Sequence, residues 1–303
     1  MRGRWVLSVA FLAAAGMAGA HENQVSITVV DTKRIIDSNG WPDHEPGQFP
    51  NDHNPNTVTE VKHHYQMPAE PEKARKSTPI GMSPFGVIVN GVPLDPSAAE
   101  WWQDDRQSGW QYEAQGGLDL GLDEHEAHVQ PDGTYHYHGL PEGVNVRDAA
   151  DGHSAQLGWA ADGFPIFGPK GYSDPLDATQ GVKELKPSWG LKEGERSGGP
   201  GGAYDGKFTQ DWEYKAGSGD LDECNGRFAV TPEFPKGTYL YILTKSFPYI
   251  PRCWTGTPDA SFIRKPMPGG GRGPGGRRRP RPGGPEGRDG EQHGRRPPPD
   301  EDR

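Results

Sequence analysis

The sequence predicts a mostly β protein, a single sandwich- or barrel-like domain with long ordered loops and a disordered C-terminal tail. Stretches with apolar residues at helical spacing are few, because 44 glycines and 31 prolines interrupt the chain. Short alternating or β-branched stretches between turn residues recur instead. No internal repeat divides the body, so we expect one domain over residues 21–263. The hydrophobic share of 32% is low, and the core needs support from ordered loops and cross-links.

The first 20 residues have the pattern of a secretory signal peptide. Arg2 and Arg4 precede an apolar stretch (5–17) and a small-residue cleavage site (18–20). We therefore expect export to the periplasm or beyond, and no later stretch predicts a transmembrane segment. Cleavage there would leave His21 as the N-terminal residue, whose amine and imidazole together can chelate copper.

Several segments of the body have strand patterns. Residues 25–30 alternate, and residues 57–67 place Thr59, Tyr65 and other side chains on one face. Residues 87–94 predict a hairpin with a two-residue Asn-Gly turn. Two further strands, 228–230 and 238–244, flank a Pro-Lys-Gly turn.

The segment 123–139 predicts the central hairpin and contains four of the eleven histidines. Pro131 suits the first central position of a type I turn, and Gly133 accepts the positive φ of a following bulge. In that register His128 faces His136 and Glu126 faces His138, all on one side of the ribbon, with Tyr135 and Tyr137 on the other. A two-residue type I′ loop would instead pair His128 with Tyr137, but proline cannot adopt its positive φ.

Three imidazoles on one face predict a transition-metal site. Neutral histidines bind copper, zinc, iron or nickel, and three protein ligands with an open position are typical of catalytic sites. His128, His136 and His138 are the predicted ligands, with copper favoured over zinc. Further candidates as ligands or supporting residues are His153, Glu126 and Asp162. The alternative is that these histidines are strand residues with satisfied hydrogen bonds.

The four residues Tyr135-His136-Tyr137-His138, followed by Gly139-Leu140-Pro141, resemble the signature of the YHYH domain family. The resemblance covers about residues 24–260 and includes further segments at 38–44, 49–56, 84–93, 128–131, 158–166, 221–227 and 247–253. It implies no settled activity. Glu126 is not part of the shared pattern.

A cupin is the second architecture that the sequence allows. His136-x-His138-x3-Glu142 matches the cupin run of metal ligands on a jelly roll, although Gln130 and Ala149 stand where that motif has glycine.

The two cysteines, Cys224 and Cys253, predict one disulfide in an oxidising compartment. The alternative is a pair of thiolate metal ligands. The disulfide would close a loop of about thirty residues and stabilise the end of the domain by roughly 3–4 kcal/mol.

Charge separates the body from the tail. Residues 264–303 hold 11 Lys/Arg and 6 Asp/Glu, which leaves 19 basic and 36 acidic residues in 21–263. The Gly/Pro/Arg-rich tail has little to bury, so we expect disorder and weak contacts with anionic surfaces. Because export is expected, nucleic acid is not an expected partner; a small-molecule partner, if any, is not identified.

The sequence thus predicts an exported metal-binding protein, with redox chemistry if the metal is copper or iron and hydrolysis if it is zinc. It shows neither a Gly-x-Ser-x-Gly nucleophile motif nor a phosphate loop. The alternative is a non-enzymatic structural or surface-interaction domain in which the Tyr-His-Tyr-His hairpin is core packing.

Overall fold

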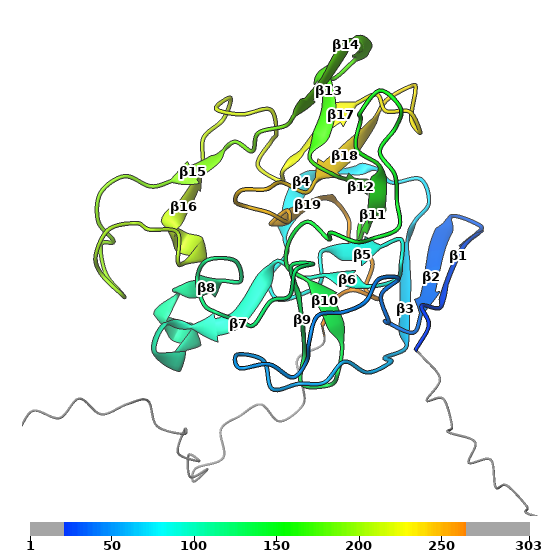
Figure 1. The fold of residues 1–303 in the computed structure, drawn as a ribbon. Helices are drawn as coiled ribbons and strands as arrows, with labels where there is room; N and C mark the ends of the chain where they lie inside the picture. Colours follow the sequence, from blue (N-terminus) through cyan, green and yellow to red (C-terminus); the bar gives the residue numbers. More distant parts are fainter. Residues whose placement is uncertain (1–20, 265–303) are drawn as a thin grey trace, which may run out of the picture. The chain divides into compact units, whose positions relative to one another are not determined.

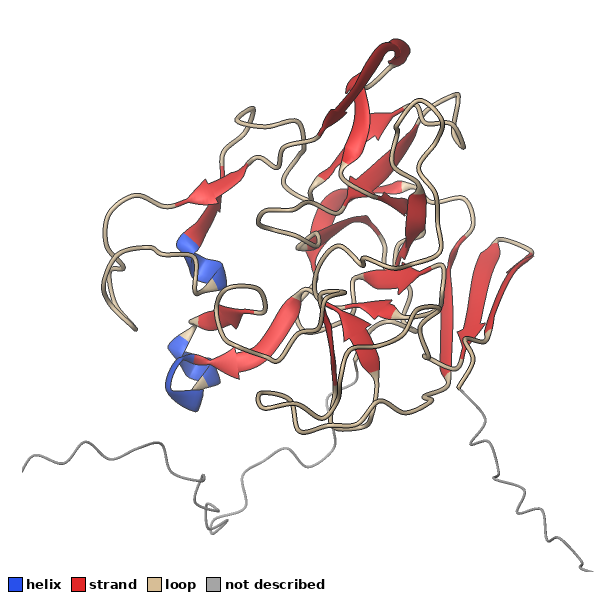
Figure 2. Cartoon of the chain, viewed as in Figure 1, coloured by secondary structure: helices blue, strands red, loops and turns tan. Residues whose placement is uncertain are grey.

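The computed structural model describes residues 21–264, of which 36% are in strands and 4% are in helices. The mostly β class is therefore confirmed (Figures 1 and 2). The predicted signal peptide and almost all of the predicted tail lie outside the described residues. The helical segments among the described residues are three single 3₁₀ turns: η1 (Trp102–Asp104), η2 (Arg106–Ser108) and η3 (Thr209–Asp211). None of the described helices is long and apolar enough to cross a membrane.

The largest sheet has eight strands and carries the Tyr-His-Tyr-His segment near one edge. Its ends are different strands, so the sheet is open and forms no closed barrel. In spatial order the strands are β17 (Gly226–Ala229), β18 (Thr238–Ile242), β12 (Pro165–Phe167), β11 (Gln156–Ala160), β5 (Gly86–Ile88), β6 (Pro93–Leu94), β10 (Tyr135–Tyr137) and β9 (Ala127–Val129).

A three-stranded antiparallel sheet contains β1 (Val25–Val30), β2 (Lys33–Ser38) and β3 (His63–Pro68), with β1 at an edge. The strand expected at 25–30 is confirmed. The strand expected at 57–67 begins only at His63, because residues 57–62 form a loop that includes the hydrogen bond from Thr59 N to Gly133 O (3.1 Å).

Four two-stranded ribbons complete the fold. They are β4 (Lys73–Pro79) with β19 (Cys253–Gly256), β7 (Ser97–Trp101) with β8 (Gln111–Glu113), β13 (Lys170–Asp174) with β14 (Asp177–Glu184), and β15 (Trp189–Leu191) with β16 (Trp212–Tyr214).

The hairpin at 86–94 forms, but its turn differs from the predicted two-residue Asn-Gly loop. Ile88 N donates to Val92 O (2.9 Å) and Gly91 N to Ile88 O (2.8 Å), with Gly91 at φ +82°. The central residues of the turn are therefore Val89 and Asn90, and Gly91 forms a bulge. The Asn90 side chain favours this form because its amide donates to Asp43 and to the hydroxyl of Tyr137.

The Cys224–Cys253 disulfide forms as predicted and links the start of β19 to the loop before β17, across 29 residues. It excludes the alternative of two thiolate ligands in this structure. Nearby, buried Trp254 donates its indole N–H to Phe85 O (2.8 Å). The main core also contains Tyr135 and Tyr137, both fully buried.

Candidate metal centre

The histidines lie on a hairpin whose register matches the prediction. β9 and β10 pair with His128 opposite His136 and Val129 opposite Tyr135. Gly133 N donates to Gln130 O and Gln130 N to Thr134 O, both at 2.9 Å, with Gly133 at φ +90°. This is the type I turn with a glycine bulge, so the alternative type I′ loop is excluded.

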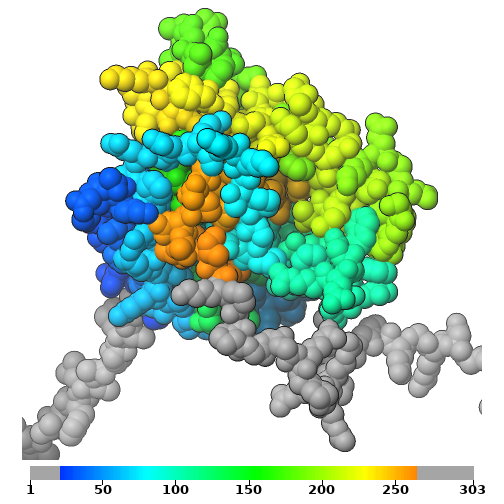
Figure 3. Space-filling view, turned by 180° about the vertical axis from the view of Figure 1, so that it is seen from behind, coloured from blue at the N-terminus to red at the C-terminus, as the bar shows by residue number. Residues whose placement is uncertain are grey.

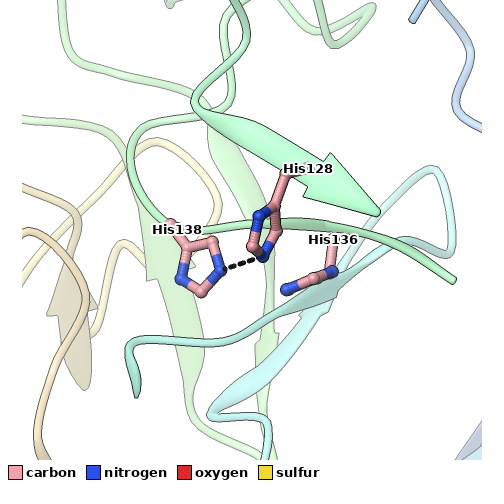
Figure 4. Close-up of side chains that lie close together, drawn as sticks. All are labelled: His128, His136 and His138. Carbon is pink, nitrogen blue, oxygen red and sulfur yellow. Dashed lines mark hydrogen bonds between the residues drawn. The ribbon is translucent and has the colours of Figure 1, made fainter. Parts of the chain in front are cut away.

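The rings of His128, His136 and His138 form a nearly equilateral triangle (Figure 4). Their centroids are 4.6, 4.7 and 4.7 Å apart. One nitrogen atom from each lies within 4.8 Å of the other two. Two nitrogens bound to a tetrahedral zinc at about 2.0–2.1 Å are roughly 3.3 Å apart. The three nitrogens are therefore close to the spacing of ligands on one ion, and the rings would have to move closer together to bind it.

Hydrogen bonds orient two of the three rings through their Nδ1 atoms. His128 Nδ1 is 3.0 Å from Leu120 O, and His136 Nδ1 is 3.3 Å from Thr134 O. Because a carbonyl only accepts, each Nδ1 carries the proton and each Nε2 keeps its lone pair. His128 Nε2 lies 3.0 Å from His138 Nε2. Within residues 21–264, no hydrogen-bond partner reaches the buried Nδ1 of His138. Main-chain carbonyls that orient imidazoles in this way are common around metal sites.

Burial keeps the three imidazoles in the form that binds metal. His136 and His138 are 2% and 3% exposed, and His128 is half-buried. Loss of hydration holds the pKa values of His136 and His138 well below the usual value and lowers the pKa of His128. The neighbouring imidazoles add to the effect at His136 and His138. At neutral pH all three rings are therefore uncharged.

The three rings open onto a cavity of about 330 Å³. Its walls include Asn54, Met82, Glu100 and the buried carboxylate of Asp95. Arg264 also lines the cavity and pairs with Asp95 at 2.8 Å. Burial raises the pKa of Asp95, and the Arg264 charge opposes that change. A ligand in this cavity would meet the imidazoles at one wall and a charged pair at another.

A polar loop holds β9 from outside the hairpin. Asn54 and Asn56 both donate their side-chain amides to Val129 O, at 3.0 and 2.8 Å. Asn51 Oδ1 accepts from the backbone N–H of His53 and of Asn54, as expected for an asparagine in a turn. The loop therefore helps to fix the position of His128, which precedes Val129.

The additional candidates do not join the triangle. Glu126 has φ +57°, which breaks the strand alternation that was expected to point it at His138. Buried His153 packs against Phe167 and Tyr172, and its Nδ1 lies 2.8 Å from Ser154 O. Neither residue is in the group of converging nitrogen donors.

Asp162 has a different role from the one predicted. Its Oδ2 accepts from the Tyr241 hydroxyl (2.6 Å) and from Gly256 N (2.8 Å), and it contacts no imidazole of the triangle. Burial raises the pKa of Asp162, while these hydrogen bonds lower it. The carboxylate therefore joins β18 to β19.

The cupin ligand set does not form. Glu142 is exposed and outside the group, and its backbone carbonyl accepts from His125 Nδ1. His21 also lies outside the group, with Nδ1 2.9 Å from Glu60 Oε1 and its ring stacked on Trp41.

The sequence did not indicate Leu120, Asp95 or Arg264. Leu120 acts through its carbonyl, which every residue has. Asp95 and Arg264 are 169 residues apart, and no local pattern predicts their pairing.

Fold and site together define a disulfide-linked β protein with a cluster of three histidines, two of them buried, beside a cavity. A family model described as "YHYH protein" matches residues 64–256, and the chain belongs to this family. The matched range contains all three histidines and both cysteines, whereas β1 and β2 precede it. Comparisons with curated proteins and with solved structures gave no match.

Proposed function

We propose that this protein binds one transition-metal ion through His128, His136 and His138. The observation that carries the proposal is the convergence of three neutral imidazoles, with the Nε2 atoms of His128 and His138 3.0 Å apart. Three imidazoles leave at least one coordination position for an external ligand. That position would face the cavity beside the rings.

Copper is the favoured metal and zinc the second. Nitrogen ligands bind Cu²⁺ more tightly than Zn²⁺, as the Irving–Williams order describes. Bound copper would supply redox chemistry, and bound zinc an activated water for hydrolysis. The residues of the chain would hold the ion, exclude bulk water through the burial of His136 and His138, and admit a small molecule through the cavity.

We also propose that the protein works outside the cytoplasm. The predicted signal peptide and the disulfide both support export, since disulfides persist in oxidising compartments. N-terminal sequencing of the protein recovered from cell fractions tests this directly. A protein that starts at His21 in an exported fraction would agree, and a cytoplasmic protein that keeps residues 1–20 would contradict it.

A non-enzymatic structural role is the second candidate, and the tyrosines favour it. Tyr135 donates to Asp123 (2.6 Å), and the Tyr137 hydroxyl lies 2.7 Å from His44 Nε2. Both tyrosines are fully buried, so half of the signature contributes to the interior. If the histidines served the same purpose, the protein would contain no metal and would keep its structure without one.

Metal content separates the two candidates. The untagged protein is purified, exposed to one equivalent of Cu²⁺ or Zn²⁺, desalted and analysed by mass spectrometry for metal. We expect about one ion per chain in the wild type and loss of the ion in His136→Ala/His138→Ala. His153→Ala is the control, because it removes a buried histidine outside the cluster. A metal-free wild type, or equal metal in all three proteins, would refute the proposal.

A further inference from the structure

The edge strand β1 is uncovered in the described part of the chain. All six residues of Val-Ser-Ile-Thr-Val-Val are exposed, and β2 is its only strand partner in the sheet. The four apolar side chains are 37–58% exposed: Val25, Ile27, Val29 and Val30. Edge strands normally carry charged residues, prolines or bulges that prevent pairing with a strand of another chain. Strand β1 has none of these features. In Figure 3 the N-terminal strands, in dark blue, lie at the rim of the molecule.

The backbone of β1 has a definite set of free hydrogen-bonding groups. Asn39 N donates to Gln24 O, and the β1–β2 register continues this pairing along the hairpin. Because hydrogen-bonded pairs alternate in an antiparallel ladder, the even-numbered residues of β1 bond to β2. The N–H and C=O groups of Val25, Ile27 and Val29 therefore point away from β2, towards the open edge.

We propose that β1 pairs antiparallel with β1 of a second copy of this chain, about a two-fold axis through Ile27. In this register Ile27 faces Ile27 of the other copy and Val25 faces its Val29. Each of these pairs can exchange two backbone hydrogen bonds, because both residues present their free groups. The three apolar side chains of each copy then share one face of a continuous six-stranded sheet.

A second copy fits this edge better than an unrelated strand for two reasons. The two-fold register satisfies the outward groups of both strands at once, as a symmetric interface requires. It also brings no like charges together across the ladder, because the strand is uncharged. One strand pair falls short of the roughly 1,200 Å² of a stable interface, so the dimer is weak and concentration-dependent. The excess of acidic residues in 21–263 gives both copies a negative charge, so they repel each other. Added salt should strengthen the dimer because it screens this repulsion.

Sedimentation velocity of the purified protein, over a concentration series in low and moderate salt, is the first test. We expect a monomer–dimer equilibrium that shifts towards dimer as salt rises. Ile27→Lys places two ammonium groups opposite each other on the axis and should raise the dissociation constant at least tenfold. Thr28→Lys adds the same charge one residue away, opposite Ser26 of the other copy, and should change it much less. A protein that stays monomeric, with its edge free for another partner or none, would overturn the proposal.

Cross-linking tests the register itself and does not depend on a stable dimer. Hydrogen-bonded antiparallel pairs have Cα atoms about 5.5 Å apart, within the range of a disulfide. Ile27→Cys should therefore form a covalent dimer under mild oxidation. Val30→Cys is the control, since the two copies of position 30 would be about 20 Å apart. Both native cysteines are already in the disulfide and do not interfere. Equal cross-linking of the two variants, or none for Ile27→Cys, would contradict the register.

Discussion

The Nε2 atoms of His128, in β9, and of His138, directly after β10, lie 3.0 Å apart. His128 Nδ1 donates to Leu120 O, so His128 Nε2 has a lone pair directed at His138. Without a metal, His138 Nε2 must carry the proton between them. His138 Nδ1 is then a buried acceptor for which the described part of the chain offers no hydrogen-bond donor. With a metal present, His128 and His138 would both serve as neutral ligands, and the ion would act as the Lewis acid between the rings in place of this proton.

The turn of the hairpin provides a test of what aligns the histidines. Gly133 has φ +90°, and a Cβ there would lie 1.9 Å from Thr59 Oγ1. Gly133→Ala should therefore lower the free energy of unfolding by more than about 1 kcal/mol and weaken metal binding. Gly152→Ala is the matched control, because Gly152 has the same φ but open space around it. Urea unfolding and metal titration of both variants measure the difference, and equal effects would exclude the Thr59 contact as the cause.

The stability of the metal-free protein should fall in mild acid. Burial lowers the pKa of all three histidines in the folded state, while in the unfolded chain they titrate near 6.5. Between these values the unfolded state binds more protons, so stability present above about pH 6.5 is lost as the pH falls towards the folded pKa values. Urea midpoints at pH 7.5 and 5.5 measure this loss. The variant His136→Ala/His138→Ala should lose less stability between pH 7.5 and pH 5.5. The same loss in the variant and the wild type would show that these histidines do not cause it.

Asp162 should affect stability and not metal binding. Asp162→Ala leaves the Tyr241 hydroxyl and Gly256 N–H buried without their acceptor, and we expect a cost of about 2–4 kcal/mol. Because Asp162 contacts none of the three imidazoles, the metal affinity of the folded variant should match the wild type. Thermal unfolding and metal titration test the two parts separately. A folded variant with greatly weakened affinity would restore Asp162 as a supporting residue of the metal centre.

The disulfide should contribute mainly to stability. It closes a 29-residue loop, for which the chain-entropy model gives about 3–4 kcal/mol. Cys224→Ser/Cys253→Ser should lower the free energy of unfolding by that amount in urea. Reduction of the wild type without mutation is the control and should produce the same loss. A loss below about 1 kcal/mol would show that the hydrogen bonds around β19 hold this part of the fold without the cross-link.

The sequence predicts those parts of the structure that local chemistry determines. The register of the β9–β10 hairpin follows from Pro131 and Gly133, and the disulfide follows from two cysteines in a chain expected to be exported. Strand β1 follows from alternating apolar and polar residues that are mostly β-branched. In each case a few neighbouring residues, or one unique pair, carry enough information.

Long-range contacts could not be predicted in this way. The order of the eight-stranded sheet depends on β12 pairing with β18, which is parallel and distant in the chain. The role of Asp162 was misjudged because its partner Tyr241 is 79 residues away. Glu126 was misplaced because its positive φ ends the strand alternation one residue before β9. The turn at Val89-Asn90 was misjudged because Asn90 is held by side chains outside the hairpin.

Electron paramagnetic resonance of the protein loaded with one equivalent of Cu²⁺ tests the central claim most directly. Nitrogen hyperfine splitting counts the imidazoles that bind the ion. We predict three equatorial or near-equatorial nitrogens in the wild type, and a changed spectrum with fewer nitrogens after each single substitution: His128→Ala, His136→Ala or His138→Ala. If all three variants gave the same spectrum as the wild type, copper would bind elsewhere, and the histidine triangle would not be a metal centre.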